Sequence, residues 1–205
     1  MTAADLSGYA AAVLGTVFIW PQVIRVYARR SVEGISGATQ LISLAGTMMW
    51  LAYGFVIDSV PMVVANANIE IALIAIVAMM VRKGAMPFWK PAAIVVGAMV
   101  YCIVVGQIAP TWVGLAGVII GTPSILPQVW RAIRTERLYG VSVMTNLLLV
   151  SMGCAWGIHG YLIGDPVVSY PNLVLIPSAS YIAWRAWQSH RMPSFHSAVV
   201  TASGQ

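Results

Sequence analysis

The amino-acid sequence predicts an all-α membrane protein whose seven transmembrane helices form two parallel three-helix bundles joined by a linker helix. Three observations predict this class. Hydrophobic residues fill 60% of the 205 positions and charged residues only 8%, which is too little charge to cover a soluble domain of this length. The charges lie between apolar runs of roughly 20 residues, the length that a helix needs to cross a bilayer. Finally, one half of the sequence repeats in the other.

The apolar runs are bounded by charges, glycines and prolines, and they define the expected spans. In order along the chain these are 7–27, 37–57, 60–81, 91–108, 111–131, 141–163 and 166–187. The connections are short, so we expect one compact unit. Asp5 precedes the first apolar run, and no basic residue does. This pattern argues against a cleaved signal peptide and predicts that the first helix is retained. The polar stretch after His190 is expected to be disordered.

The charges also predict an orientation. The eleven lysines and arginines follow the first, third, fifth and seventh spans, so all of them fall on one side of the membrane. The opposite side carries Asp5, Asp58 and Asp165. Basic residues beside membrane helices indicate the cytoplasmic side, so the net charge of +5 is not read as a sign of nucleic-acid binding. We expect a cell-membrane protein with its N-terminus outside and its C-terminus in the cytoplasm.

The second half of the chain repeats the first at a constant offset of 106 residues. Aligned without a gap, residues 15–76 and 121–182 are identical at 16 of 62 positions, which indicates an internal duplication. Each copy covers three spans, and the fourth span returns the chain across the membrane, so both copies begin on the same side. The predicted units are repeat 1 at 1–82, a linker helix at 83–110, repeat 2 at 111–190 and a cytoplasmic tail at 191–205.

Two prolines stand at equivalent points of the repeat, Pro21 and Pro127. A proline inside a helix lacks the N–H of its hydrogen bond and bends the helix. A static bend is one interpretation, because membrane helices tolerate proline; the symmetric pairing favours two hinges that open and close the cytoplasmic end. Gln22 and Gln128 place an amide beside each proline, where it could satisfy a freed backbone carbonyl.

Trp50 and Trp156 form a second pair, and they lie deeper than tryptophans of an interfacial belt. An indole offers a flat apolar face and one N–H donor, which suits a sugar ring or another neutral ligand. Asn66 and Asn172 follow on the neighbouring spans. Such amides can simply hold helices together, but they also match hydroxyl groups without requiring charge. We expect the four side chains to line one central cavity.

Two titratable residues lie within the expected spans. Glu70 follows Asn66 by one turn and is matched in the repeat by Ile176. An ionisable group at that depth is a candidate for proton or cation coupling, and a neutral carboxylic acid bonded to a neighbour is the alternative. His159, matched by Tyr53, is a second candidate for coupling, although a structural histidine is the favoured interpretation.

Together these features resemble the SWEET/PQ-loop superfamily. The resemblance rests on two apolar helices ending in Pro-Gln, each followed by a basic turn with Gly-x-Ser, a Trp-x-x-x-Gly helix and a helix bearing Asn. It covers residues 15–182 and is greatest to the SWEET sugar transporters, relatives of the three-helix SemiSWEETs. It implies parallel repeats and alternating-access, facilitated transport of a small neutral solute, a mono- or disaccharide. The residues implied to bind substrate are Trp50, Asn66, Trp156 and Asn172, with Pro21 and Pro127 as hinges.

Two alternatives stay open. The first is a proton-coupled PQ-loop carrier of amino acids or other small metabolites, because Glu70 departs from the pattern of a facilitator. The second is a membrane receptor or scaffold on the same fold. We expect neither an enzyme, a cofactor nor a metal, because the sequence offers no nucleophile–base pair, metal constellation or phosphate loop. Cys102 and Cys154 are expected to be free thiols in apolar spans. With both repeats in one chain, a monomeric transport unit is expected.

Overall fold

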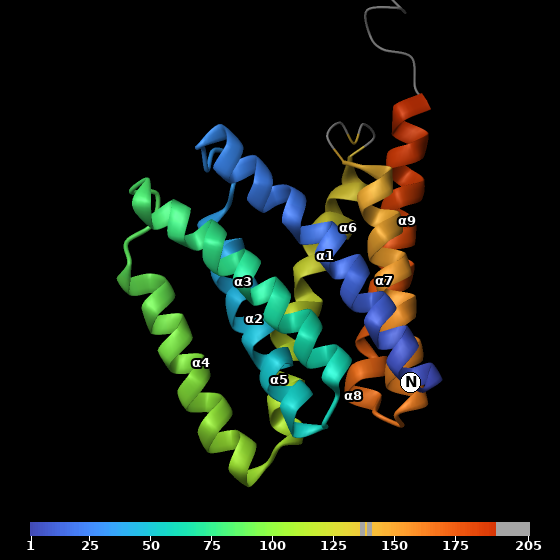
Figure 1. The fold of residues 1–205 in the computed structure, drawn as a ribbon. Helices are drawn as coiled ribbons and strands as arrows, with labels where there is room; N and C mark the ends of the chain where they lie inside the picture. The colour runs from blue at the N-terminus through green and yellow to red at the C-terminus, as the bar shows by residue number, and fades with distance from the viewer. Residues whose placement is uncertain (136–137, 139–140, 192–205) are drawn as a thin grey trace, which may run out of the picture.

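The computed structural model describes residues 1–135, 138 and 141–191, and all its described elements are helices (Figure 1). The first half comprises α1 (Ala3–Arg29), α2 (Gly37–Val56), α3 (Val60–Arg82) and α4 (Trp89–Ile108). The second half comprises α5 (Thr111–Gly121), the 3-10 helix η1 (Thr122–Ile125), α6 (Leu126–Arg134), α7 (Val143–Leu162), α8 (Pro166–Ser169) and α9 (Pro171–Arg191). Arg137, Gly140 and the predicted disordered tail at 192–205 lie outside the described residues.

Helix capping explains where several helices begin. The Thr2 hydroxyl accepts a hydrogen bond from the backbone N–H of Asp5, whose carboxylate accepts one from the N–H of Thr2, and this reciprocal capping box starts α1. Ser36 and Ser142, which are equivalent in the repeat, cap the N-termini of α2 and α7, because each hydroxyl accepts a hydrogen bond from the backbone N–H three residues later. The duplication therefore preserves local helix signals as well as residue identities.

Membrane-spanning length and hydropathy are met by six helical stretches, namely α1, α2, α3, α4, α7 and the run Thr111–Arg134. The seventh expected span forms α8 and the 21-residue α9, separated at Tyr170 before Pro171. α9 is long enough to span a bilayer at 1.5 Å per residue, but it is more polar than the others and contains Pro177 and Arg185. The predicted fold class, a polytopic all-α membrane protein, is confirmed.

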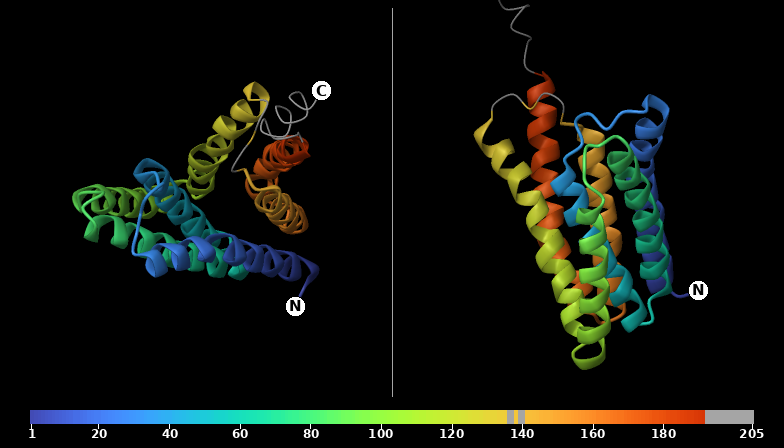
Figure 2. Two further views of the ribbon diagram at one scale, coloured as in Figure 1. Left: turned by 90° about the horizontal axis from the view of Figure 1, so that it is seen from above. Right: turned by 90° about the vertical axis from the view of Figure 1, so that its left-hand side faces the viewer.

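The two halves share one packing order. In the first bundle α3 packs against both α1 and α2, and in the second α9 packs against both α6 and α7, so the third helix of each repeat lies between the other two. Across the interface α1 packs on α7 and α2 packs on α5, which pairs the first helix of each repeat with the second helix of the other. Seen from above, α4 lies to one side and α7 and α9 to the other, and α1 runs across so that its N-terminal part lies beside α7 (Figure 2).

Two equivalent glycines allow the repeats to approach closely. A Cβ on Gly8 of α1 would lie 2.9 Å from the ring of His159, and a Cβ on Gly114 of α5 would lie 2.9 Å from the ring of Tyr53. Both distances are shorter than real Cβ contacts, so a larger residue would force the helices apart. Small residues serve this purpose at membrane helix interfaces, where backbones must come close.

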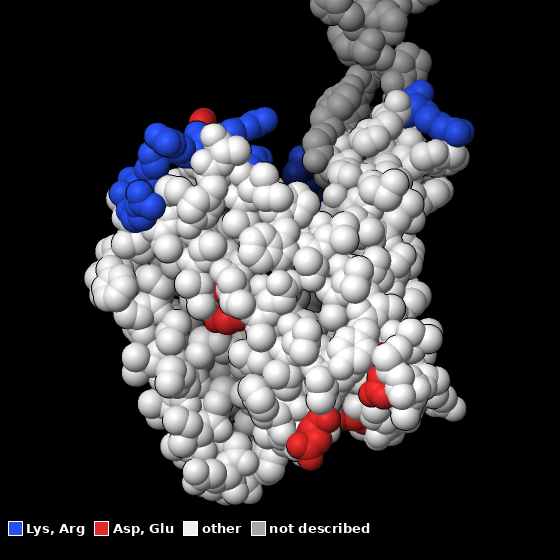
Figure 3. All heavy atoms as spheres, viewed as in Figure 1, with Lys and Arg blue, Asp and Glu red and all other residues white. Residues whose placement is uncertain are grey.

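The linker helix and the charges complete the arrangement. α4 packs on α2 and α5, and only Pro91 and Ala98 are buried along it. Figure 3 shows that the Lys and Arg atoms on this face gather where α1, α3 and α9 end, and that the face is notched there. We call this the basic end. The opposite end carries acidic atoms on the same face.

Candidate substrate cavity

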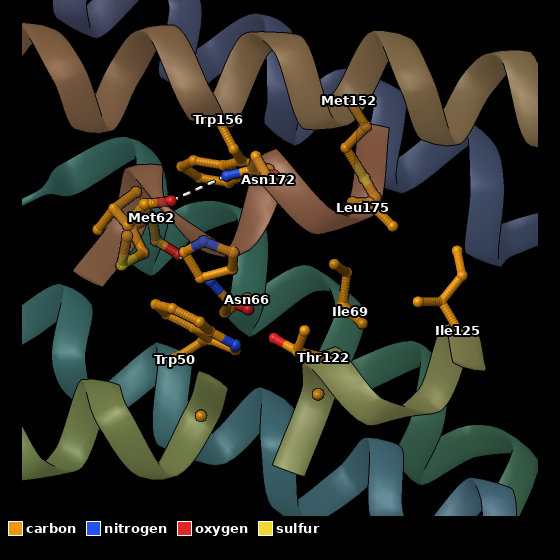
Figure 4. Close-up of a pocket in the computed structure, with 14 residues that line it drawn as sticks. Trp50, Met62, Asn66, Ile69, Thr122, Ile125, Met152, Trp156, Asn172 and Leu175 are labelled. Atoms are coloured by element: carbon orange, nitrogen blue, oxygen red, sulfur yellow. Dashed lines mark hydrogen bonds between the residues drawn. The ribbon is translucent and has the colours of Figure 1, made fainter. Parts of the chain in front are cut away.

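A cavity of about 250 Å³ lies between the two repeats. Its walls are mostly apolar and come from α2, α3, α5, η1, α7, α8 and α9 (Figure 4). All four residues expected to bind substrate line it: Trp50, Asn66, Trp156 and Asn172. An apolar pocket with a few convergent polar groups is the usual form of a small-molecule site.

The two asparagines have the same local geometry. The amide nitrogen of Asn66 donates to the carbonyl of Met62 at 2.9 Å, and that of Asn172 donates to the carbonyl of Val168 at 2.8 Å. Each bond reaches back four residues, so the amide is held against its own helix. Neither side-chain oxygen accepts a hydrogen bond from a described residue, and this leaves one acceptor on each repeat for a ligand.

The two tryptophans also have matching neighbours. Trp50 meets Tyr53 edge-on with ring centroids 6.3 Å apart, and Trp156 meets His159 edge-on at 5.5 Å. Neither indole N–H donates to another described residue. On α5, a Cβ on Gly117 would lie 3.0 Å from the Trp50 ring, so the absence of a side chain there provides the space for this indole.

Two crossed hydrogen bonds join the repeats at the end opposite the basic end. The Tyr53 hydroxyl donates to Asp165 at 2.8 Å, and the Ser59 hydroxyl lies 2.9 Å from Nε2 of His159. The offset of 106 relates Tyr53 to His159 and Ser59 to Asp165, so one pair is the repeat image of the other with the two repeats exchanged.

His159 is held by a second contact that fixes its tautomer. Its Nδ1 lies 2.8 Å from the carbonyl oxygen of Ala4; since a carbonyl only accepts, Nδ1 carries the proton. In the neutral ring Nε2 then accepts the Ser59 hydroxyl proton. His159 is 2% exposed and its ring nitrogens are both paired, which agrees with the structural interpretation of this residue. Within the described part of the chain, the side-chain hydrogen bonds between repeats all lie at this end.

The two predicted hinge prolines stand in different surroundings. Pro21 lies inside the continuous helix α1, whereas Pro127 lies at the start of α6 directly after η1. Neither lines the cavity. Neither Gln22 nor Gln128 makes a side-chain hydrogen bond within the described residues, and Gln128 is exposed. An exposed amide at this boundary has solvent or lipid headgroups to pair with instead.

Glu70 lies outside the cavity wall. It is only 8% exposed, and its Oε2 has no hydrogen-bond partner among the described residues. The preceding residue, Ile69, does line the cavity. The carboxyl is therefore buried but is not part of the cavity lining.

Sequence reasoning missed the crossed pairs and the wall formed by the fifth span. Positions 53 and 159, like 59 and 165, carry different residue types in the two repeats, so a search for identities overlooks them. The available signal was complementary hydrogen-bonding chemistry at one spacing, six residues apart in each copy. Gly117 and Gly121 contribute from the end of α5, and Thr122 contributes from a local helix break that the first repeat lacks.

This fold and cavity define a helical membrane protein built from two related three-helix units around a central site. The PQ loop repeat family model matches residues 3–62. The chain is 35% identical over 79 residues to the sugar transporter SemiSWEET of Bradyrhizobium diazoefficiens, covering 38% of this chain and 92% of that protein. It is 36% identical over 62 residues to the SemiSWEET of Leptospira biflexa, covering 30% of this chain and 73% of that one.

A solved eukaryotic SWEET transporter has the same fold. The two superpose with a TM-score of 0.71 at 19% sequence identity, covering 93% of this chain and all of the other. The chain belongs to the SWEET/PQ-loop superfamily.

Proposed function

We propose that this protein is a facilitative transporter of small sugars, which binds a mono- or disaccharide between the Trp/Asn pairs of its two repeats. The observation that carries the proposal is the convergence of both pairs on one cavity at equivalent positions. The indole faces suit sugar rings, and the two free amide oxygens suit sugar hydroxyls. The similarity to SemiSWEET sugar transporters supports the same substrate class.

Alternating access follows from the distribution of contacts. The crossed pairs Tyr53–Asp165 and Ser59–His159 hold the repeats together at one end, while the surface is notched at the basic end (Figure 3). Within this proposal, the structure represents a state closed at the end of the crossed pairs, which we assign to the outside, and the basic end is the side that opens to the cytoplasm. Closure at the prolines and rupture of the crossed pairs would expose the same cavity to the outside, and Pro21 and Pro127 are the hinges we propose for this movement.

The boundaries and surroundings of the transport unit belong to the same proposal. Residues 1–82 and 111–190 form the two repeats and 83–110 the linker, with the basic end in the cytoplasm and the cell membrane as the location. Because α1–α7 and α2–α5 contacts close the interface within one chain, a monomer suffices for transport.

A proteoliposome flux assay with a panel of mono- and disaccharides tests the proposed function. The double variant Asn66→Ala, Asn172→Ala is expected to lose at least tenfold in uptake, since it removes both amide acceptors. Asn68→Ala is the matched control: Asn68 lies on α3 with Asn66, but its amide bonds Trp20 and Thr16 instead of lining the cavity. Unchanged uptake by the double variant would show that these two asparagines do not form the substrate site. Saturable peptide binding without flux by the wild type would favour the receptor alternative.

The buried Glu70 carboxyl supports a second candidate, a proton-coupled carrier of amino acids or other metabolites. Burying an unpaired ionisable group at this depth costs free energy, and its presence there therefore points to a function. Glu70→Gln keeps the shape and removes the titration. If the variant transports at the wild-type rate with the wild-type pH dependence, the coupling candidate fails and the facilitator stands.

A further inference from the structure

The cavity is less symmetric than the repeat. The fifth span contributes Gly117, Gly121, Thr122 and Ile125 to its wall, whereas no residue of α1 lines it. The repeat equivalent of Thr122 is Thr16 on α1. One threonine therefore lies at the cavity and its counterpart does not, although both are identical in sequence.

The two hydroxyls also differ in their partners. Thr16 donates to the carbonyl of Ala12 at 2.9 Å and accepts from the amide of Asn68 at 2.7 Å. In repeat 2 the residue equivalent to Asn68 is Val174, which cannot donate. The Thr122 hydroxyl makes no hydrogen bond within the described part of the chain, including the bond to the carbonyl four residues earlier that threonine commonly makes in a helix.

The local backbone explains why Thr122 faces the cavity. Pro123 follows it where α1 has Val17, and Pro127 follows four residues later. Proline removes helical hydrogen bonds and clashes with the preceding turn, so the α-helix gives way to the 3-10 helix η1 at Thr122–Ile125. Figure 4 shows the Thr122 oxygen and the Trp50 indole nitrogen pointing into the same part of the cavity.

We propose that Thr122 is a specificity-determining residue whose hydroxyl hydrogen-bonds one hydroxyl group of the transported sugar beside the Trp50 N–H. The proposal rests on the proposed function and deepens it. An indole N–H only donates, whereas a threonine hydroxyl both donates and accepts; the two groups together match a sugar hydroxyl, which does both. An analogue that lacks this sugar hydroxyl would leave the Thr122 hydroxyl unpaired in a desolvated site, and this cost opposes its binding.

The test measures binding and counterflow of glucose and its 2-, 3-, 4- and 6-deoxy analogues in proteoliposomes. Thr122→Val is nearly isosteric and removes the hydroxyl, while Thr122→Ser keeps it. We expect Thr122→Val to weaken glucose binding about 3- to 10-fold, the value of one neutral hydrogen bond, and Thr122→Ser to restore most of it. One deoxy analogue is expected to bind wild type and Thr122→Val equally, and this analogue identifies the hydroxyl that Thr122 contacts.

Thr16→Val is the matched control. It removes the equivalent hydroxyl with its two internal bonds, so we expect a lower melting temperature and unchanged affinity for every probe. Equal affinities of wild type and Thr122→Val for all five sugars would overturn the assignment, as would an equal loss for all five. Failure of the wild type to bind any of the five would also overturn the assignment, whereas only failure to transport every sugar of the mono- and disaccharide panel would overturn the proposed function.

Discussion

At the scale of single residues, Tyr53 and His159 link the end of the molecule to the cavity. Each ring packs edge-on against the tryptophan of its own repeat and hydrogen-bonds a residue of the other repeat. A change in the crossed pairs therefore reaches the cavity wall through a single aromatic contact. This coupling requires no intervening network, because the two contacts share one side chain.

Tyr53→Phe is expected to favour the state that is open to the outside. The variant keeps the ring and removes the hydrogen bond to Asp165, worth about 1 kcal/mol, or roughly a fivefold shift in the equilibrium. Distances between spin labels on the α2–α3 and α7–α8 turns would measure it. Tyr161→Phe, at a position 80% exposed, is the control. An unchanged distance distribution in Tyr53→Phe would refute the role of the crossed pair.

Gly117→Ala is expected to weaken sugar binding, because the new methyl group would lie 3.0 Å from the Trp50 ring and displace it. A loss of about tenfold corresponds to overpacking of 1–3 kcal/mol. Gly97→Ala on α4 makes the same chemical change where no atom lies within 4 Å. Sugar-binding titrations measure the affinity of both variants. Equal sugar affinities of Gly117→Ala and Gly97→Ala would show that the position of the Trp50 indole does not affect binding.

At the scale of helices, the two equivalent prolines of the repeat lie in different structural surroundings. α1 continues through Pro21, and the fifth span divides into α5, η1 and α6 around Pro123 and Pro127. The same dipeptide thus lies inside a continuous helix in one repeat and in the first turn of a new helix in the other. The hinge proposal predicts unequal effects from the two sites.

Pro21→Ala is expected to raise the melting temperature and slow transport, because proline in a helix interior costs about 3 kcal/mol relative to alanine and its removal stiffens α1. Pro127→Ala should stabilise less, since proline is tolerated in the first turn of a helix. Thermal unfolding in detergent and initial flux rates measure both. Faster transport by Pro21→Ala would contradict a hinge at this position.

At the scale of the whole molecule, the one-sided basic charge predicts how the protein sits in the membrane. In a background without Cys102 and Cys154, Ala85→Cys probes the basic end and Thr111→Cys the opposite end, both at exposed positions. A membrane-impermeant maleimide should label Thr111→Cys in intact cells and Ala85→Cys only after permeabilisation. The reverse pattern would invert the proposed orientation.

Much of the fold was predictable because its signals are local or repeated. Apolar length gave the helices, and the offset of 106 related Trp50 to Trp156 and Asn66 to Asn172, which the structure brings to one cavity. Side-chain partners across the interface were not predictable. The bond between Tyr53 and Asp165 depends on how α2 packs against repeat 2; the six-residue spacing of each pair is visible in the sequence, but it does not by itself say which residues meet across the interface.

The break of the fifth span lies between these cases. From the repeat, Pro127 was expected to bend the fifth span as Pro21 bends the first, whereas Pro123 has no counterpart in repeat 1, which carries Val17 there. The additional proline at 123 overrides that symmetry, since the two missing N–H groups fall in successive turns of the same span. The direction of the Thr122 side chain follows from that local conflict and not from the duplication.

The helix break at η1 also affects how a ligand is oriented. A site with perfect twofold symmetry would accept a molecule in two orientations of equal energy, and this degeneracy contributes about 0.4 kcal/mol of mixing entropy, RT ln 2. With Thr122 on one wall only, the two orientations are no longer equivalent. An asymmetric ligand is then expected to prefer one orientation, by roughly fivefold if the preference equals one neutral hydrogen bond of about 1 kcal/mol.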